Sequence, residues 1–347
     1  PVSGLSEIVA IAGGTQHSLA LRRDGTVWAW GENASGQLGD GTQIRRTSPV
    51  QVVTFTNVVA IAAGGSHSLA LKADGTVWAW GQNASGQLGD GTQFQRITPV
   101  QVPGLSGVTA VAAGALHSLA LRTDGGASGS VWTWGYNING QLGDGSSAQL
   151  RTSPAIVFQG VVGIAAGESH TLAVTSAGTL WSWGQGSAGQ LGDGSDVGRP
   201  VPVEVIELDD VQMPAGGADH SLSIRGNGTL WAWGSSDMIG LYGVGGGGTH
   251  IKKPSRVAGA GTDVVVAKAG KDFSVAARRN GAVWAWGFNT YGQFGDGTTT
   301  LSATPVQVPG FSLTNADWLS GDPDGDGLTT YRELQLGTDP LNPDTNG

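Results

Sequence analysis

Apolar and polar positions alternate along this chain in short segments that recur about every 50 residues. One copy contains an apolar run at Val58–Gly64 and two alternating runs, at His67–Lys72 and Thr76–Trp80. Short apolar runs and period-two alternation are typical of buried and half-buried β-strands. Asp74-Gly75 lies between the alternating runs and predicts a two-residue hairpin turn, because both positions favour positive φ. A fourth extended segment is expected at Pro99–Val102, whose proline suits an edge strand.

The copies are marked by the tetrapeptide Trp-x-Trp-Gly, which occurs six times. Twelve of the 13 tryptophans lie in these tetrapeptides, and only Trp318 lies outside them. The tetrapeptides begin at Trp28, Trp78, Trp132, Trp181, Trp231 and Trp284. A repeat of this length with four short strands predicts a β-propeller, in which small sheets stack around an axis. A linear β-solenoid is the alternative, and it would need caps at both ends.

The predicted fold class is therefore all-β, a propeller of six blades, or of seven if one blade lies upstream of Pro1. We expect each blade to carry large side chains on one face and small ones on the other, so that stacking buries both. The propeller is predicted to span residues 1–311. Residues 312–347 are predicted to form a linker and a C-terminal segment, with a short helix at Thr330–Gly337.

Composition narrows the possible functions. Thirteen tryptophans indicate a packed core, so the 60 glycines are expected in turns. The net charge of −9 argues against nucleic-acid binding, which depends on clustered Lys and Arg. The sequence has no cysteine, which excludes disulfides and thiolate chemistry. No apolar run approaches the roughly 20 residues needed to span a bilayer.

Two polar positions recur in the repeats, and we interpret both as structural. One is a histidine that phenylalanine replaces in the sixth copy, expected to be buried with a hydrogen bond to a neighbouring strand rather than to bind metal. The other is an aspartate in a "GQLGDG"-type loop, expected to cap backbone N–H groups. These positions are His17, His67, His117, His170, His220 and Phe273, and Asp40, Asp90, Asp144, Asp193 and Asp296.

No nucleophile–base pair, cofactor motif or small-molecule site is evident, so the sequence does not predict an enzyme. Gly243–Gly248 formally matches a dinucleotide-binding fingerprint but lacks the strand–helix context that such a site needs. This segment is either a flexible excursion from one blade or a partner-binding loop. Exposed Lys252, Lys253 and Arg256 would support the second interpretation.

The C-terminal segment contains the spacing of an EF-hand-type calcium loop. Acidic residues stand at positions 1, 3, 5 and 12 of "DPDGDGLTTYRE", with glycine at 6. A backbone carbonyl at position 7 and a hydroxyl or bridging water at 9 would complete the oxygen ligands. The predicted Ca²⁺ ligands are Asp322, Asp324, Asp326, Leu328, Thr330 and Glu333. The alternative is an acidic flexible tail without metal.

The repeat "AAG-x-x-HSLAL…DG-x-VWAWG-x-N-x-x-GQLGDGT" resembles that of the regulator of chromosome condensation family, from about Pro1 to Gly310. The resemblance implies a propeller, and its best-known member is a nucleotide exchange factor for a small GTPase that also docks on chromatin. The exchange factor acts through a wedge that projects from one blade. No such wedge is expected here, because the insertion found in a hairpin of this sequence, Gly125–Ser130, is short and flexible. "GTDPLNPDTNG" (Gly337–Gly347) and the calcium loop resemble bacterial thrombospondin type 3 repeats, which implies an extracellular, calcium-stabilised stalk.

Together these patterns predict a non-enzymatic propeller that binds another macromolecule, an unidentified protein or surface ligand, through one of its faces. The predicted setting is a bacterial surface or secreted protein with a calcium-stabilised C-terminal stalk. The alternative is a cytoplasmic regulator that acts as an exchange factor on a small GTPase.

Overall fold

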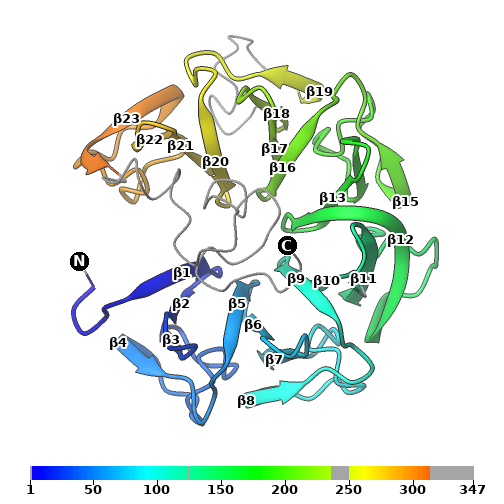
Figure 1. Ribbon diagram of the computed structural model, residues 1–347, viewed down its shortest axis with the longest axis vertical. Helices are drawn as coiled ribbons and strands as arrows, with labels where there is room; N and C mark the ends of the chain where they lie inside the picture. Colours follow the sequence, from blue (N-terminus) through cyan, green and yellow to red (C-terminus); the bar gives the residue numbers. More distant parts are fainter. Residues whose placement is uncertain (1, 124, 236–249, 313–347) are drawn as a thin grey trace. The chain divides into compact units, whose positions relative to one another are not determined.

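The computed structural model describes residues 2–123, 125–235 and 250–312 of the chain, and these form 23 strands joined by turns (Figure 1). The chain divides into two compact units, Pro1–Ser169 and His170–Gly347. The described residues contain no helix, and therefore none that could cross a bilayer. The architecture is all-β, as predicted.

The first unit contains three repeats, each of which forms an antiparallel meander. Neighbouring strands pair in sequence order, from β1 to β4, from β5 to β8 and from β9 to β12. The strands are β1 (Ile8–Gly13), β2 (His17–Arg22), β3 (Val27–Gly31), β4 (Arg46–Gln51), β5 (Val58–Ala63), β6 (His67–Lys72), β7 (Val77–Gly81), β8 (Arg96–Gln101), β9 (Val108–Ala113), β10 (His117–Arg122), β11 (Gly129–Tyr136) and β12 (Leu150–Ala166).

The second unit continues the same pattern. Its meanders run from β13 to β15, from β16 to β19 and from β20 to β23. The strands are β13 (His170–Thr175), β14 (Leu180–Gly184), β15 (Arg199–Glu204), β16 (Val211–Gly216), β17 (His220–Arg225), β18 (Leu230–Gly234), β19 (Ile251–Arg256), β20 (Val264–Ala269), β21 (Phe273–Arg278), β22 (Ala282–Gly287) and β23 (Ser302–Ser312).

The predicted hairpin between β6 and β7 is confirmed, but its loop has three residues rather than two. The Lys72 N–H donates to the Thr76 carbonyl at 3.0 Å, so residues 73–75 form the loop. Only Gly75 has a positive φ, 76°, and the Asp74 carboxylate instead accepts the Thr76 N–H at 3.0 Å. The aspartate therefore closes the turn with its side chain, and the glycine supplies the left-handed backbone of a bulge.

The prediction that each blade separates large from small side chains is wrong. Residues that face each other across β6 and β7 pair a large side chain with a small one: Ala70 with Trp78, and Leu69 with Ala79. Paired residues of an antiparallel ladder lie on the same side of the sheet. Each face therefore carries both sizes, and large side chains on one strand fill the space that small ones leave on the next.

The prediction of six or seven blades is also wrong. The strands form four sheets of four strands and one sheet of seven, β9–β15. The difference arises at β12, a single strand of 17 residues where the other repeats have two strands and a turn. Ten positions separate Ser48 from Val58, but only eight separate their counterparts Ser153 and Val161. The shorter connection has no room for the turn, so the backbone stays extended. The predicted helix at Thr330–Gly337 lies outside the described residues.

Candidate functional site

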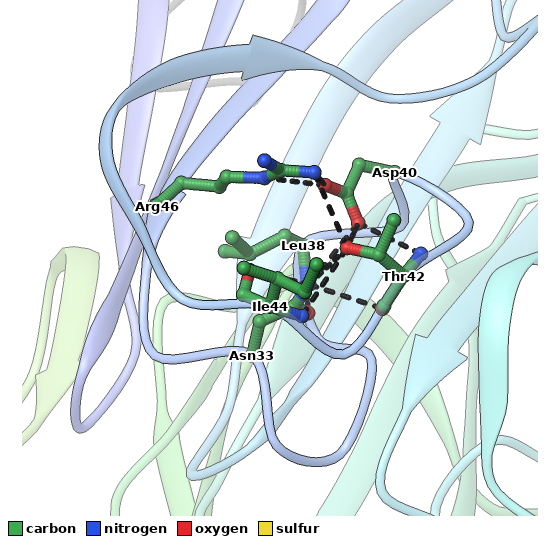
Figure 2. Close-up of polar contacts among 6 residues, drawn as sticks. All are labelled: Asn33, Leu38, Asp40, Thr42, Ile44 and Arg46. Carbon is green, nitrogen blue, oxygen red and sulfur yellow. Dashed lines mark hydrogen bonds and ion pairs between the residues drawn. The ribbon is translucent and has the colours of Figure 1, made fainter.

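The most regular polar structure in the chain is the loop between the third and fourth strands of a repeat. In the first repeat it is organised by Asn33, which is fully buried. The Asn33 Nδ2 donates to the carbonyls of Thr42 and Ile44 at 3.0 and 3.2 Å, and its Oδ1 accepts the Leu38 N–H at 3.0 Å (Figure 2). One buried amide thus holds three distant points of the loop backbone.

Asp40 completes the framework of this loop from the other side. Its Oδ1 accepts the backbone N–H and the hydroxyl of Thr42 at 3.0 and 2.7 Å (Figure 2). Its Oδ2 accepts from the Arg46 guanidinium, with Nε at 2.8 Å and the nearer terminal nitrogen at 2.7 Å. Burial alone would raise the pKa of Asp40, but the hydrogen bonds from Thr42 and Arg46 outweigh it and lower the pKa below its ordinary value.

The same framework returns in other repeats, which confirms the prediction that these aspartates cap turns. Ion pairs join Asp90 to Arg96, Asp144 to Arg151 and Asp193 to Arg199. Buried asparagines recur at Asn83, Asn137 and Asn289. The sixth repeat differs, because Ser302 pairs with Gly287 where an arginine pairs in the first repeat. Sequence reasoning identified the aspartates but missed the asparagine seven residues before four of them, which Gly186 replaces in the fourth repeat, and the arginine six or seven residues after four of them.

These rigid loops expose large apolar side chains. The exposed fractions are 61% for Ile44, 74% for Phe94, 57% for Ile138, 55% for Val197 and 87% for Tyr291. We call these five residues the apolar tips. The first three lie in the first unit and the other two in the second, one in each of the five loops that the structure describes.

The loops of neighbouring repeats in the first unit are held side by side. The Gly41 N–H donates to the Ile97 carbonyl at 3.1 Å, and the Gly91 N–H donates to the Thr152 carbonyl at 2.9 Å. Because each arginine neutralises the aspartate with which it pairs, the net charge that remains on these loops is small. The arrangement can present apolar side chains on a fixed frame, which suits contact with another macromolecule.

The recurrent histidines are buried, as predicted, and each described bond links one repeat to the next. His67 Nε2 lies 2.9 Å from Ser118 Oγ, which donates its proton to the Gln87 carbonyl at 2.8 Å. The serine therefore accepts from His67, which must carry its proton on Nε2. Burial lowers the pKa of His67 to about 3. Equivalent bonds join His17 to Ser68, His170 to Ser221 and His220 to Ser274. Within the described residues, no cluster of three metal-binding side chains occurs.

Lys252 and Lys253, which follow the glycine-rich segment in the sequence, each form an ion pair. Lys252 Nζ lies 2.7 Å from Asp196 and Lys253 Nζ lies 2.5 Å from Glu207. They join β19 to the preceding repeat, so their charges are compensated. Gly243–Gly248 lies outside the described residues, as do all six predicted calcium ligands and Trp318.

Comparisons with known proteins agree with the repeat pattern. Residues 1–321 match the family described as RCC1-like domain, and residues 322–343 match the family described as bacterial TSP3 repeat. The human E3 ubiquitin-protein ligase HERC2 is 34% identical over 200 residues, which are 53% of this chain and 4% of the ligase. The chain thus spans a small fraction of that relative.

Two solved structures of yeast Prp20 are similar in fold and in sequence. The crystal structure of Kap60 bound to yeast RCC1 (Prp20) matches at 28% identity with a TM-score of 0.76, over 87% of this chain and 74% of the other. The structure of Prp20p from Saccharomyces cerevisiae, described with its binding properties to Gsp1p and histones, matches at 27% with a TM-score of 0.74, over 87% and 76%.

Proposed function

This chain belongs to the RCC1-like domain family, and from that premise we propose that its propeller is a non-enzymatic scaffold that binds another macromolecule through the apolar tips. The observation that carries the proposal is a contrast within the loops. It is complete in the first three repeats, whereas the fourth has Gly186 in place of the asparagine and the sixth has Ser302 in place of the arginine. The buried amide and the ion pair fix the backbone, while a large apolar side chain points away from that framework into solvent. Preorganised apolar and aromatic anchors lose little entropy on binding.

The proposal is tested by comparing three forms of the full chain in an affinity capture. One is unaltered, one carries Ile44→Ser, Phe94→Ser and Ile138→Ser, and one carries Ile156→Ser. The last is the matched control, because Ile156 is 45% exposed but lies on β12 and not on a loop tip. A macromolecule retained by the unaltered and control chains should bind the triple variant at least about tenfold more weakly. Equal retention by all three would show that the tips do not bind it.

We further propose that the C-terminal segment is a calcium-stabilised stalk of a bacterial surface or secreted protein. The match of residues 322–343 to a bacterial TSP3 repeat supports this. The donor set fits the ion, because Asp322, Asp324, Asp326 and Glu333 supply the hard carboxylate oxygens that Ca²⁺ prefers. Bound Ca²⁺ would supply positive charge that screens the repulsion among these carboxylates.

Calorimetric titration with Ca²⁺ tests the stalk. The full chain should bind in the sub-millimolar to millimolar range of extracellular modules. A variant carrying Asp324→Ala and Glu333→Ala should lose this binding, while Asp40→Ala, which changes a carboxylate of the propeller loops, should keep it. Absence of binding by the unaltered chain would remove the calcium proposal and with it the main support for an extracellular location.

A second candidate function is nucleotide exchange on a small GTPase in the cytoplasm. It is favoured by the similarity to Prp20, since one of the matched structures is described with binding to Gsp1p. The test is release of a fluorescent guanine nucleotide from purified Gsp1p, with and without the full chain. Acceleration that the three tip substitutions abolish would favour exchange activity, and an unchanged rate would contradict it for this GTPase.

A further inference from the structure

Three asparagines among the described residues are followed directly by glycine, and all three are exposed. They are Asn139, Asn227 and Asn280. An Asn-Gly pair loses ammonia readily without an enzyme, because glycine has no side chain to shield its nitrogen from the neighbouring amide. The glycine nitrogen bonds to Cγ of the asparagine, the bond from Cγ to Nδ2 breaks, and ammonia leaves with the proton of the glycine amide. Water then opens the cyclic imide to aspartate or to its β-linked isomer.

The backbone around the three pairs is nearly the same. The glycine has a positive φ in each, of 78° at Gly140, 75° at Gly228 and 82° at Gly281. Each glycine N–H donates to the carbonyl three residues earlier, at 2.9, 2.8 and 2.9 Å respectively. The nitrogen that must attack is therefore turned toward that carbonyl, and the reaction requires the turn to open locally. The three pairs differ in how firmly the asparagine side chain holds its turn closed.

The side chains of Asn227 and Asn280 both hold their turns. Asn227 Oδ1 accepts the N–H and the hydroxyl of Thr229, at 3.1 and 2.7 Å. Asn280 Oδ1 accepts the Ala282 N–H at 3.0 Å, and alanine has no hydroxyl to supply a second bond. The turn at Asn280 is therefore held by one side-chain bond fewer than the turn at Asn227.

The side chain of Asn139 has no hydrogen-bond partner within the part of the chain that the structure describes. Its backbone N–H donates to Gln141 Oε1 at 3.0 Å. Ser85 makes the same backbone bond to Gln87 Oε1 in the second repeat, at 2.9 Å, so the loop does not need an asparagine at this position. The Asn139 amide is thus free to turn its carbon toward the Gly140 nitrogen whenever the turn opens.

We propose that Asn139 is a site of self-deamidation, which converts faster than Asn280, and that Asn280 converts faster than Asn227. The order follows the number of side-chain bonds that hold each turn, which is none, one and two. The product at Asn139 carries a negative charge directly after Ile138, one of the apolar tips, which is 57% exposed. Ageing of the protein therefore converts this loop from an apolar to an anionic one without an enzyme.

Ageing of the full chain in mildly alkaline buffer, followed by peptide mapping with mass spectrometry at successive times, tests the proposal. Alkaline buffer favours loss of the glycine amide proton, and the mapped peptides give a rate of conversion for each asparagine. Each side-chain bond should slow conversion about fivefold, the factor by which one ordinary hydrogen bond shifts an equilibrium. Conversion of Asn139 that is no faster than that of Asn227 would overturn the proposal.

Two matched substitutions isolate the contribution of the hydroxyl bond. Thr229→Val removes the hydroxyl and keeps the branched shape, so Asn227 should convert about fivefold faster, at a rate near that of Asn280. Ala282→Thr supplies a hydroxyl at the equivalent position, so Asn280 should convert more slowly by a similar factor. Rates that neither substitution changes would also overturn the proposal, and circular dichroism before ageing shows whether each variant is folded.

The consequence for recognition rests on the proposed function and is measured separately. Asn139→Ser installs the residue that the second repeat carries at Ser85 and cannot deamidate. After ageing, a macromolecule that the fresh chain retains through its tips should bind the unaltered chain more weakly than the serine variant. Equal binding by both would contradict an effect on recognition. If the fresh chain retains nothing through its tips, the proposed function fails, whereas the assignment of Asn139 is still decided by the mapped rates.

Discussion

Lowering the pH should destabilise this protein well before the loop aspartates Asp40, Asp90 and Asp193 titrate, because its recurrent histidines are buried without charge. Burial lowers the pKa of His17 and His170 to about 4 and that of His67 and His220 to about 3, from 6.5. A base whose pKa falls on folding stabilises the folded state fully above its unfolded pKa. That contribution is lost as the pH falls from 6.5 toward the folded pKa, because the unfolded chain takes up protons that the folded chain refuses.

As long as the imidazole stays neutral in the folded chain, the loss of folding free energy depends only on the pKa of the histidine in the unfolded chain. At about pH 5, each histidine of ordinary pKa costs about 2 kcal/mol of folding free energy. If the four act independently, the total of about 8 kcal/mol is comparable with the whole stability of a typical protein. The loop carboxylates do not interfere, since the pKa values of Asp40, Asp90 and Asp193 are lowered and they lose their contribution only below the ordinary carboxyl range.

Urea unfolding of the full chain and of His67→Phe, at about pH 7.5, 6 and 5, measures this slope. The substitution is one that the sixth repeat already carries at Phe273. We expect the variant to lose about 2 kcal/mol less than the unaltered chain between the two extremes, because one proton uptake has been removed. An identical loss in both chains would refute the assignment of His67 as a neutral, buried imidazole. The variant's stability at pH 7.5 does not enter, since only the change with pH is compared.

Three further outcomes follow from the same contacts. Gly14→Ala should lower the free energy of unfolding by about 1–3 kcal/mol, because the added Cβ would lie 2.3 Å from the His17 imidazole. Gly13→Ala is the control: its Cβ would meet nothing within 4 Å, so thermal unfolding should show a change within about 0.5 kcal/mol. Asn83→Ala should cost about 2–4 kcal/mol and speed hydrogen exchange in its loop, since two backbone carbonyls and one N–H lose their partner. Arg96→Gln should raise the pKa of Asp90, measured by carboxyl carbon NMR, because burial would then act with one fewer opposing hydrogen bond.

The strands of the repeat could be predicted because their signal is local. His67–Lys72 alternates in sequence and forms β6 with the same bounds. That Leu150–Ala166 forms one long strand could not be predicted from the pattern alone, because its residues suit one strand as well as two. What decided it was a connection two residues shorter than in the first repeat, which left no turn. Patterns specify which residues are extended, whereas the length between them specifies where one strand stops.

The loop framework was only half predictable for a related reason. An aspartate followed by Gly-Thr is a local turn signal, and Asp40 accepts from Thr42 as expected. Its bonds to Asn33 and Arg46 close only when the loop has folded back on itself. Their fixed offsets from the aspartate were visible in the sequence, but an offset alone does not state that two side chains meet.

Comparison of the loops with one another separates positions that are limited by packing from positions that vary. Among the loops that the structure describes, the buried position after the glutamine is Leu38, Leu88, Leu142 and Leu191 in the first four repeats and Phe294 in the sixth, so packing limits it. The exposed position four residues after the aspartate is isoleucine, phenylalanine, alanine, valine and threonine in turn. Where it is small, as in the third and sixth repeats, another residue of the same loop is large and exposed, Ile138 or Tyr291.

Exposing a large apolar side chain to water is unfavourable. If the tips only faced solvent, a large apolar side chain in every described loop would therefore be unexpected. The framework beneath the tips is meanwhile the same in the first three repeats, and its charged side chains form ion pairs such as that of Asp90 with Arg96. The varied and exposed residues, rather than the recurrent polar ones, are therefore the ones that can distinguish one partner from another. A partner that fits them should be largely apolar where it meets the tips, and its affinity should depend little on salt.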